Sequence, residues 1–182
     1  MADLAPLTAL GAAAPRSLEA GAFTLTERPD IALASLALRR GQIAPILDGL
    51  TLPAPGAFAS GNGLGALWSG QGQWLIAGEG LAETDFAARV RAMAAGASVT
   101  DQTDGWTAIA LTGDAARLDA VLERLVNLPP DALAPGRATR TVLHHMSVIL
   151  VRHDRERLTI WGMRSAAGSL RHTLETVVRR LS

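Results

Sequence analysis

The sequence predicts an α+β fold of two similar halves, each running strand–helix–strand–strand–helix, with antiparallel sheets covered on one face by helices. Hydrophobic residues switch repeatedly between the two-residue period of strands and the longer period of helices. The same element order occurs twice, because 75 positions separate Ile31 from Trp106 and 81 separate Thr84 from Ser165. Apolar residues make up 48% of the 182 residues and charged residues 19%, so the chain can bury a sizeable core.

The first predicted half covers residues 23–97 and follows a loose N-terminal arm at 1–22 that is rich in alanine and proline. The segment 23–27 alternates as an edge strand does, and 31–38 carries apolar residues on both faces, as a buried strand does. Apolar residues at helical spacing then predict a helix over 43–50, with a proline tolerated near its first turn.

A hairpin and a helix complete the first half. Residues 66–68 and 74–77 are predicted as short strands, and the glycines between them suit a tight turn with positive φ angles. Thr84 is the expected N-cap of a helix whose core stripe includes Phe86 and Val90.

The second predicted half covers residues 98–182 and repeats the pattern of the first. Its expected elements are a strand at 106–111, a helix from Asp114, strands at 145–151 and 158–161, and a helix after Ser165. The two halves share their pattern of elements and almost none of their residue identities. We expect them to form one compact unit.

The composition excludes several classes of protein. The formal net charge is zero, so the surface has no general attraction for nucleic acid or anionic membranes. Charged residues, glycines and prolines interrupt every apolar run before it could span a bilayer, and the N-terminal stretch is a poor signal peptide. The protein is therefore expected in the cytoplasm, without a nucleic-acid or membrane partner.

The residue types that are missing narrow the possible chemistry further. All 17 basic residues are arginines, and the chain contains no lysine, cysteine or tyrosine. This excludes a Schiff-base or phosphate-loop lysine, a cysteine nucleophile, a disulfide, and zinc or iron–sulfur sites with thiolate ligands.

The histidines and the glycine-rich loop do not form a recognisable site either. His144 and His145 are adjacent on a predicted strand, so their rings point to opposite faces and cannot hold one metal ion. His153 and His172 have no partner at ligand spacing. The glycines at 61–65 precede a strand instead of opening a helix, unlike a phosphate loop. No catalytic, cofactor-binding or metal-ligating residue is predicted.

Tryptophan and arginine residues are the candidates for a partner interface, since both types are enriched at interface hot spots. Two tryptophans flank the first hairpin, and a third ends a strand in the last hairpin, around which arginines cluster. The predicted contacts are Trp68, Trp74, Arg152, Trp161 and Arg164. The alternative reading of these residues is a packed core and a solvated hairpin.

Four segments occur in a fixed order, namely LWSGQGQWLI at 67–76, VTDQTDGWTAIALTGDAARL at 99–118, PGRATRTVL at 135–143 and RSAA at 164–167. Together they resemble the gamma subunit of heterotetrameric sarcosine oxidase. LWSGQGQWLI at 67–76 is similar to the family's Trp-x-Gly-Pro-Asp-Glu-Trp-Leu, with Gln-Gly-Gln replacing Pro-Asp-Glu at the turn. VTDQTDGWTAIALTGDAARL at 99–118 is similar to its aspartate, strand and Leu-x-Gly-x-x-Ala passage. PGRATRTVL at 135–143 is similar to its Gly-x-x-x-Arg-Thr-x-Leu, and RSAA at 164–167 fits the start of its final helix.

The resemblance implies a fold like the folate-binding domain of the glycine-cleavage aminomethyltransferase. It also implies a non-catalytic gamma subunit that packs against a larger alpha-type subunit, a flavin-carrying beta-type subunit and a small delta-type subunit. Such a complex oxidatively demethylates sarcosine to glycine. Its FAD, FMN, NAD, zinc and tetrahydrofolate belong to the other subunits, and no cofactor motif of the family transfers to a position in this chain.

Two rival functions stay open on the sequence. A stand-alone aminomethyltransferase-like module would bind tetrahydrofolate itself, with an aspartate near Asp101 and an arginine near Arg152 holding its pterin and glutamate groups. A homo-oligomeric scaffold would instead carry a self-complementary apolar patch.

Overall fold

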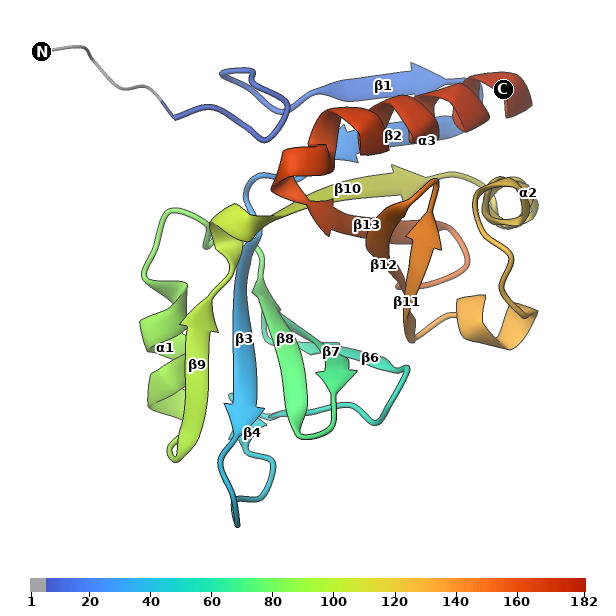
Figure 1. Cartoon of the computed structure of the whole chain (residues 1–182). Helices are drawn as coiled ribbons and strands as arrows, with labels where there is room; N and C mark the ends of the chain where they lie inside the picture. The colour runs from blue at the N-terminus through green and yellow to red at the C-terminus, as the bar shows by residue number, and fades with distance from the viewer. Residues whose placement is uncertain (1–5) are drawn as a thin grey trace, which may run out of the picture.

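Two antiparallel sheets and three α-helices make up this α+β fold (Figure 1), which the structure, a computed structural model, describes over residues 6–182. Sheet A has six strands in the order β1-β2-β10-β13-β12-β11, and sheet B has five in the order β6-β7-β8-β3-β9. None of the helices in this part of the chain is long and apolar enough to cross a membrane.

The elements of sheet A are β1 (Ser17–Ala20), β2 (Phe23–Glu27), β10 (Trp106–Thr112), β11 (Arg137–Leu143), β12 (Met146–Arg152) and β13 (Arg157–Met163). Those of sheet B are β3 (Ala32–Leu38), β6 (Phe58–Gly61), β7 (Leu64–Gly70), β8 (Gln73–Gly78) and β9 (Ala97–Asp101). A small ladder pairs β4 (Ile46–Leu47) with β5 (Leu50–Thr51). The helices are α1 (Phe86–Met93), α2 (Ala115–Leu125) and α3 (Ala167–Leu181), with short 3₁₀ turns η1 (Thr103–Gly105), η2 (Pro130–Leu133) and η3 (Arg164–Ala166).

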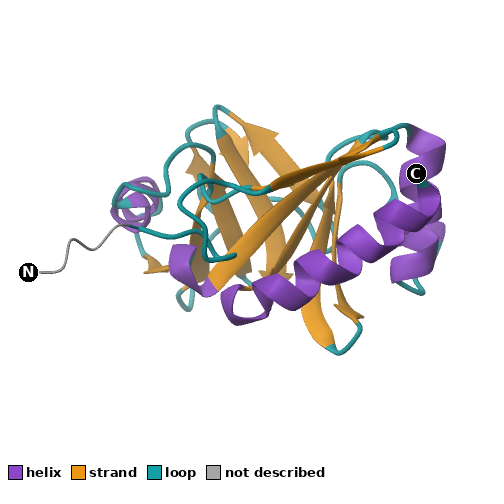
Figure 2. Ribbon diagram, turned by 90° about the horizontal axis from the view of Figure 1, so that it is seen from above, coloured by secondary structure: helices purple, strands orange, loops and turns teal. Residues whose placement is uncertain are grey.

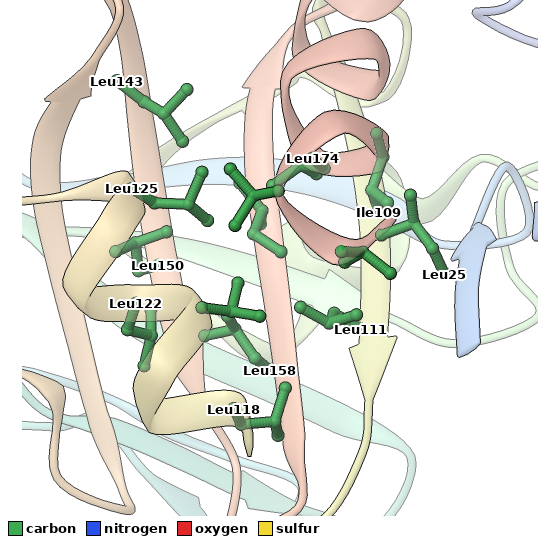
Figure 3. Close-up of a cluster of buried hydrophobic side chains, with 14 of the residues drawn as sticks. Leu25, Ile109, Leu111, Leu118, Leu122, Leu125, Leu143, Leu150, Leu158 and Leu174 are labelled. Carbon is green, nitrogen blue, oxygen red and sulfur yellow. The ribbon is translucent and has the colours of Figure 1, made fainter. Parts of the chain in front are cut away.

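Helices α2 and α3 cover the outer face of sheet A. Figure 3 shows Leu118 and Leu122 of α2 and Leu174 of α3 pointing toward leucines and an isoleucine of the strands, in one buried cluster. Seen from above, α3 lies across the outside of the molecule and ends at the C-terminus (Figure 2). Burial of one apolar stripe on each helix supplies most of the stability that such short helices lack alone.

Helix α1 covers the outer face of sheet B in the same way, burying Phe86 and Val90 in a second cluster. Its N-cap is Asp85, whose Oδ1 accepts a hydrogen bond of 2.9 Å from the N–H of Ala88. The predicted cap, Thr84, lies one residue earlier, and its hydroxyl donates to the carbonyl of Leu81. The predicted start of α2 at Asp114 is confirmed, since its Oδ1 accepts from the N–H of Arg117 at 3.0 Å.

The inner faces of the two sheets meet in a third hydrophobic cluster. Leu33, Leu67 and Leu75 of sheet B pack there with Ile149 and Trp161 of sheet A. The molecule therefore has layers of helix, sheet, sheet and helix, with the two sheets in direct contact at its centre.

The predicted helix over 43–50 is wrong. Residues in this stretch form β4 and β5, which are joined by a tight turn at Asp48 and Gly49 with φ angles of 49° and 82°. Asp-Gly is a strong signal for a two-residue hairpin turn with both φ angles positive, and the helical spacing of the apolar residues obscured it. Leu47 and Leu50 are buried as expected, whereas Ile43 and Ile46 are exposed.

The loose arm predicted at 1–22 also needs correction where the structure describes it. Residues 17–20 form β1, which pairs with β2, while residues 1–5 of the arm lie outside the described part of the chain. The buried Glu27 holds the preceding segment, because its carboxylate oxygens accept hydrogen bonds from the N–H groups of Leu10 at 3.1 Å and Arg16 at 3.2 Å.

The sheets do not follow the boundary predicted between residues 97 and 98. Strand β2 pairs with β10 in sheet A, and β9, which begins at this boundary, pairs with β3 in sheet B. Sheet A therefore combines strands from both ends of the chain. In the sequence, the strands of sheet B lie between β2 and β10. Local hydrophobic pattern cannot reveal such pairing, because a strand has the same period in either sheet.

Candidate functional site

A cavity of about 420 Å³ opens between the two sheets, and it is the strongest candidate for a ligand site. Its apolar lining includes Phe58 and Leu67 of sheet B and Val151 and Trp161 of sheet A. Polar side chains gather in the same lining, namely Arg28, Glu79, His153, Arg157 and Thr159. An apolar floor with a few polar groups is the usual composition of a small-molecule pocket.

Small residues on facing strands create this space. Gly65 and Ala77 are direct cross-strand partners in sheet B, and Ala110 stands opposite Thr159 in sheet A. All four residues line the cavity. A Cβ atom on Gly65 would lie 3.0 Å from Cε2 of Phe58, so the glycine lets this ring pack against the strand.

His153 is a half-buried titratable group in the lining of the cavity. Its Nε2 lies 2.8 Å from Oγ1 of Thr159, and its ring makes an edge contact with Phe58 at a centroid distance of 4.9 Å. Burial lowers the pKa of His153 below its usual range, and the positive charge of Arg157 lowers that pKa further. The ring is therefore a neutral hydrogen-bonding group at neutral pH.

The arginines of the cavity are already engaged within the chain. Arg28 makes a two-pronged pair with Asp30, in which Nε and Nη2 each donate at 2.8 Å, and its Nη2 lies 3.8 Å from Glu79. Hydrogen bonding to Arg28 holds the pKa of the Asp30 carboxyl below its usual range. Arg157 likewise pairs with Asp154, which lowers the pKa of that carboxyl. Both arginines therefore already have carboxylate partners within the chain, and these pairs hold their side chains in place at the cavity.

A second cavity, of about 610 Å³, adjoins the first and lies beneath the N-terminal segment that Glu27 anchors. Arg28, Ile31 and Trp161 line both cavities. Arg164 holds the N-terminal segment over this second cavity, since its Nη2 donates to the carbonyl of Leu7 at 2.9 Å. Its Nη1 also lies 3.8 Å from Asp104, whose side chain is exposed.

The histidine pair occupies a turn and not a strand. His144 and His145 have φ angles of 45° and 73° and connect β11 to β12, so the strand predicted to begin at 145 begins at 146. Both side chains are exposed. Within residues 6–182, no group of three or more histidine, aspartate or glutamate side chains is placed to hold a metal ion.

Of the five predicted interface residues, three are buried within the chain. Trp74 is 7% exposed, and its Nε1 donates to the carbonyl of Pro53 at 2.8 Å. Trp161 and Arg152 are 5% and 3% exposed. Trp68 and Arg164 are half-buried, so they have more surface to offer a partner. The interface role of all five stays a prediction.

The structure does not bring together Asp101 and Arg152, the two positions near which folate-binding residues were expected. Asp101 ends β9 at the edge of sheet B, where its Oδ1 accepts from the N–H of Thr103 at 2.8 Å. Arg152 lies on β12 in sheet A, where its Nη2 donates to Asp119 of α2 at 3.1 Å. Neither residue lines the cavity between the sheets or the cavity beneath the N-terminal segment.

Sequence reasoning missed the residues that meet in the inter-sheet cavity. Phe58 begins β6 of sheet B and His153 lies in the turn between β12 and β13 of sheet A, and no spacing in the sequence links them. Arg28 directly follows β2, so the sequence shows only an arginine in a loop. The glycines of β7 were the one available signal, because glycine inside a strand often marks a close approach of another group.

The neutral state of His153 gives a pH-dependent prediction. Below the ordinary histidine pKa of about 6.5, the unfolded chain takes up a proton that the buried ring resists, so stability falls as the pH drops. Between pH 7.5 and 5.0 we expect the wild type to lose more stability than His153→Gln, by at most about 1.4 kcal/mol per pH unit. Glutamine keeps a hydrogen-bonding group near Thr159.

Urea unfolding at each pH measures this effect, and His172→Gln, which alters an exposed helical histidine, is the control. The carboxyls of Asp30 and Asp154 have lowered pKa values and titrate below this interval. An identical pH dependence for wild type and His153→Gln would contradict the prediction.

Comparisons with known proteins show which solved structures have a similar fold. No protein-family model matches the sequence, and no curated protein matches it either. A chain of the heterotetrameric sarcosine oxidase from Corynebacterium sp. U-96, solved in complex with pyrrole 2-carboxylate, matches with a TM-score of 0.72 and 24% identity, over 90% of this chain and 88% of that chain. Aminomethyltransferase T of the glycine cleavage system from Bartonella henselae matches with a TM-score of 0.54 and 16% identity, over 81% of this chain and 44% of that chain.

These likenesses concern the fold. The chain is structurally similar to a sarcosine oxidase subunit along nearly the whole length of both, and it has an aminomethyltransferase-like fold. The resemblance indicated by the sequence motifs is thus confirmed at the level of structure. The chain corresponds to less than half of the aminomethyltransferase.

Proposed function

We propose that this chain is the gamma-type subunit of a heterotetrameric sarcosine oxidase complex and that its role there is structural. The observation that carries the proposal is the structural likeness to one chain of such an enzyme, which extends over 90% of this chain and 88% of that chain. The ordered motifs at 67–76, 99–118 and 135–143 support the same assignment.

The state of the polar side chains supports a structural role. At the inter-sheet cavity, Arg28 and Arg157 are held by Asp30 and Asp154. His153 has Thr159 as its polar partner, and a threonine hydroxyl does not orient a general base as a carboxylate does. In this proposal the oxidation of sarcosine belongs to alpha-type and beta-type partners that carry FAD, FMN, NAD, zinc and tetrahydrofolate. A small delta-type subunit completes the complex in the cytoplasm.

Coexpression tests the proposal. The tagged full chain is produced with the candidate flavoprotein subunits encoded near it, and the eluate is analysed by size exclusion and absorption spectroscopy. We expect a yellow complex of fixed stoichiometry that forms peroxide when sarcosine is added. The same partner subunits expressed without this chain should assemble less completely. A colourless chain that elutes alone in every combination contradicts the proposal.

A stand-alone tetrahydrofolate-binding module is the second candidate, and the inter-sheet cavity favours it. The cavity has the size and lining of a small-molecule pocket, and the fold is aminomethyltransferase-like. Titration of the isolated chain with tetrahydrofolate separates the two functions. Micromolar binding that Ala110→Phe abolishes would support the stand-alone module, since Ala110 lines the cavity. A purely structural subunit should not respond to the titration.

A further inference from the structure

Two isoleucines stand out on the surface of the described chain. Ile43 is 88% exposed and Ile46 is 65% exposed, the two highest values among the large hydrophobic residues in residues 6–182. They lie three positions apart in the connection between β3 and β5. Figure 1 shows this connection projecting beyond the end of sheet B, away from sheet A. We call residues 39–46 the isoleucine finger.

The exposure of this pair conflicts with the sequence pattern. Ile43 and Ile46 share helical spacing with Leu47 and Leu50, and only the two leucines are buried. A single exposed apolar side chain is ordinary, but two neighbours on a projecting loop are not needed by the core and cost solubility. Places where local pattern and structure disagree are often functional, because the residues then serve something outside the folded chain.

The finger is held in place at both ends. The N–H of Leu38 donates to the carbonyl of Gly72 at 2.9 Å, and the N–H of Gln42 donates to the carbonyl of Arg39 at 3.0 Å. The side chain of Gln42 packs against Gly96, where a Cβ atom would lie 2.8 Å from its Oε1. Pro45 restricts the backbone before β4, and Leu47 is fully buried. A loop ordered in advance loses little entropy when it binds.

Two arginines give the finger a positive base. Arg39 and Arg40 are both exposed, and neither belongs to an ion pair within residues 6–182. The one side-chain hydrogen bond found for them there joins Nε of Arg39 to Oγ of Ser98 at 3.3 Å. Large apolar residues beside unpaired arginines match the composition of protein interfaces, where arginine is enriched.

We propose that the isoleucine finger docks into an apolar pocket bordered by carboxylates on the larger partner subunit. Ile43 and Ile46 fill the pocket, and Arg39 and Arg40 pair with the acidic border. This inference rests on the proposed function, because it names the surface by which the chain joins that complex. A membrane is a poorer occupant, since anionic lipid surfaces are recognised by clusters of about four to eight basic residues and this finger has two.

The double variant Ile43→Ser/Ile46→Ser tests the apolar contact in the full chain. The variant chain is titrated against the purified wild-type partner subunits. We expect its affinity for them to fall roughly tenfold or more. Val142→Ser is the matched control, because Val142 is 63% exposed on β11 in the other sheet. Both variants change exposed residues, so their unfolding temperatures should match that of the wild type. If the isoleucine variant unfolds at a lower temperature, Ile43→Thr/Ile46→Thr replaces it.

The charge reversal Arg39→Glu/Arg40→Glu tests the acidic border. We expect it to weaken assembly and to remove most of the salt sensitivity of wild-type binding. Unchanged assembly of both double variants, beside a wild type that assembles, would overturn the docking site and leave the proposed function standing. A wild type that joins no flavoprotein would overturn both. Flotation of the wild type with anionic vesicles, lost in the isoleucine variant, would overturn the inference in favour of a membrane.

Discussion

Leu174→Ala is expected to lower the free energy of unfolding by about 3 kcal/mol, within the roughly 2–5 kcal/mol found for buried leucine truncations. Leu174 is fully buried in the cluster that joins α3 to sheet A (Figure 3). Its removal leaves a cavity bounded by leucines from β strands and from α2, which are themselves packed and cannot close the gap completely. The loss therefore combines the transfer free energy of the side chain with the cost of the cavity.

Urea unfolding followed by tryptophan fluorescence measures this change, with Leu7→Ala as the control. Leu7 is 54% exposed, so its truncation should change the unfolding free energy by less than about 0.5 kcal/mol. Similar losses for both variants would mean that α3 does not close the core of sheet A. A lower slope of unfolding against urea in Leu174→Ala alone would instead indicate that α3 detaches before the sheet unfolds.

Arg152→Met is expected to lower the free energy of unfolding by about 2–4 kcal/mol, because it removes the donor of several hydrogen bonds made by a buried charged side chain. The Arg152 side chain is 4% exposed, and its Nε donates to the carbonyl of Asp154 at 2.6 Å. Its Nη2 donates to the carbonyl of Arg155 and to Asp119 of α2. One buried arginine thus holds the turn between β12 and β13 and fastens it to a helix. Methionine preserves much of the apolar volume and none of the donors.

Two comparisons separate the parts of this effect. Asp119 is 59% exposed, so its ion pair with Arg152 is solvated, and Asp119→Asn should cost less than about 1 kcal/mol. Arg155→Met changes an exposed side chain in the same hairpin and should be nearly neutral. If Asp119→Asn costs as much as Arg152→Met, the ion pair and not the carbonyl contacts dominates, and our account of Arg152 is wrong.

The role of Arg152 illustrates what sequence reasoning about the site could achieve. An arginine-rich hairpin is visible in the sequence, but its pattern does not tell which arginine turns inward. Cross-strand register decides this, because Arg152 shares its face with the buried Val148 and Leu150. Trp74 and Trp161 were likewise recognisable as important apolar residues, and only the packing of two sheets shows how deeply they are buried.

By itself the sequence determined the class of fold, the strands and helices with a strong period, and the likeness to a sarcosine oxidase subunit. Strand β10 and helix α2 were predictable because one buried face imposes a repeating pattern within a few residues. Tertiary structure alone decided that β2 joins β10, that Ile43 and Ile46 are exposed while Leu47 and Leu50 are buried, and that a cavity opens beside His153. These features depend on pairing between residues far apart in the chain, and hydrophobic period carries no information about which partner a strand will meet.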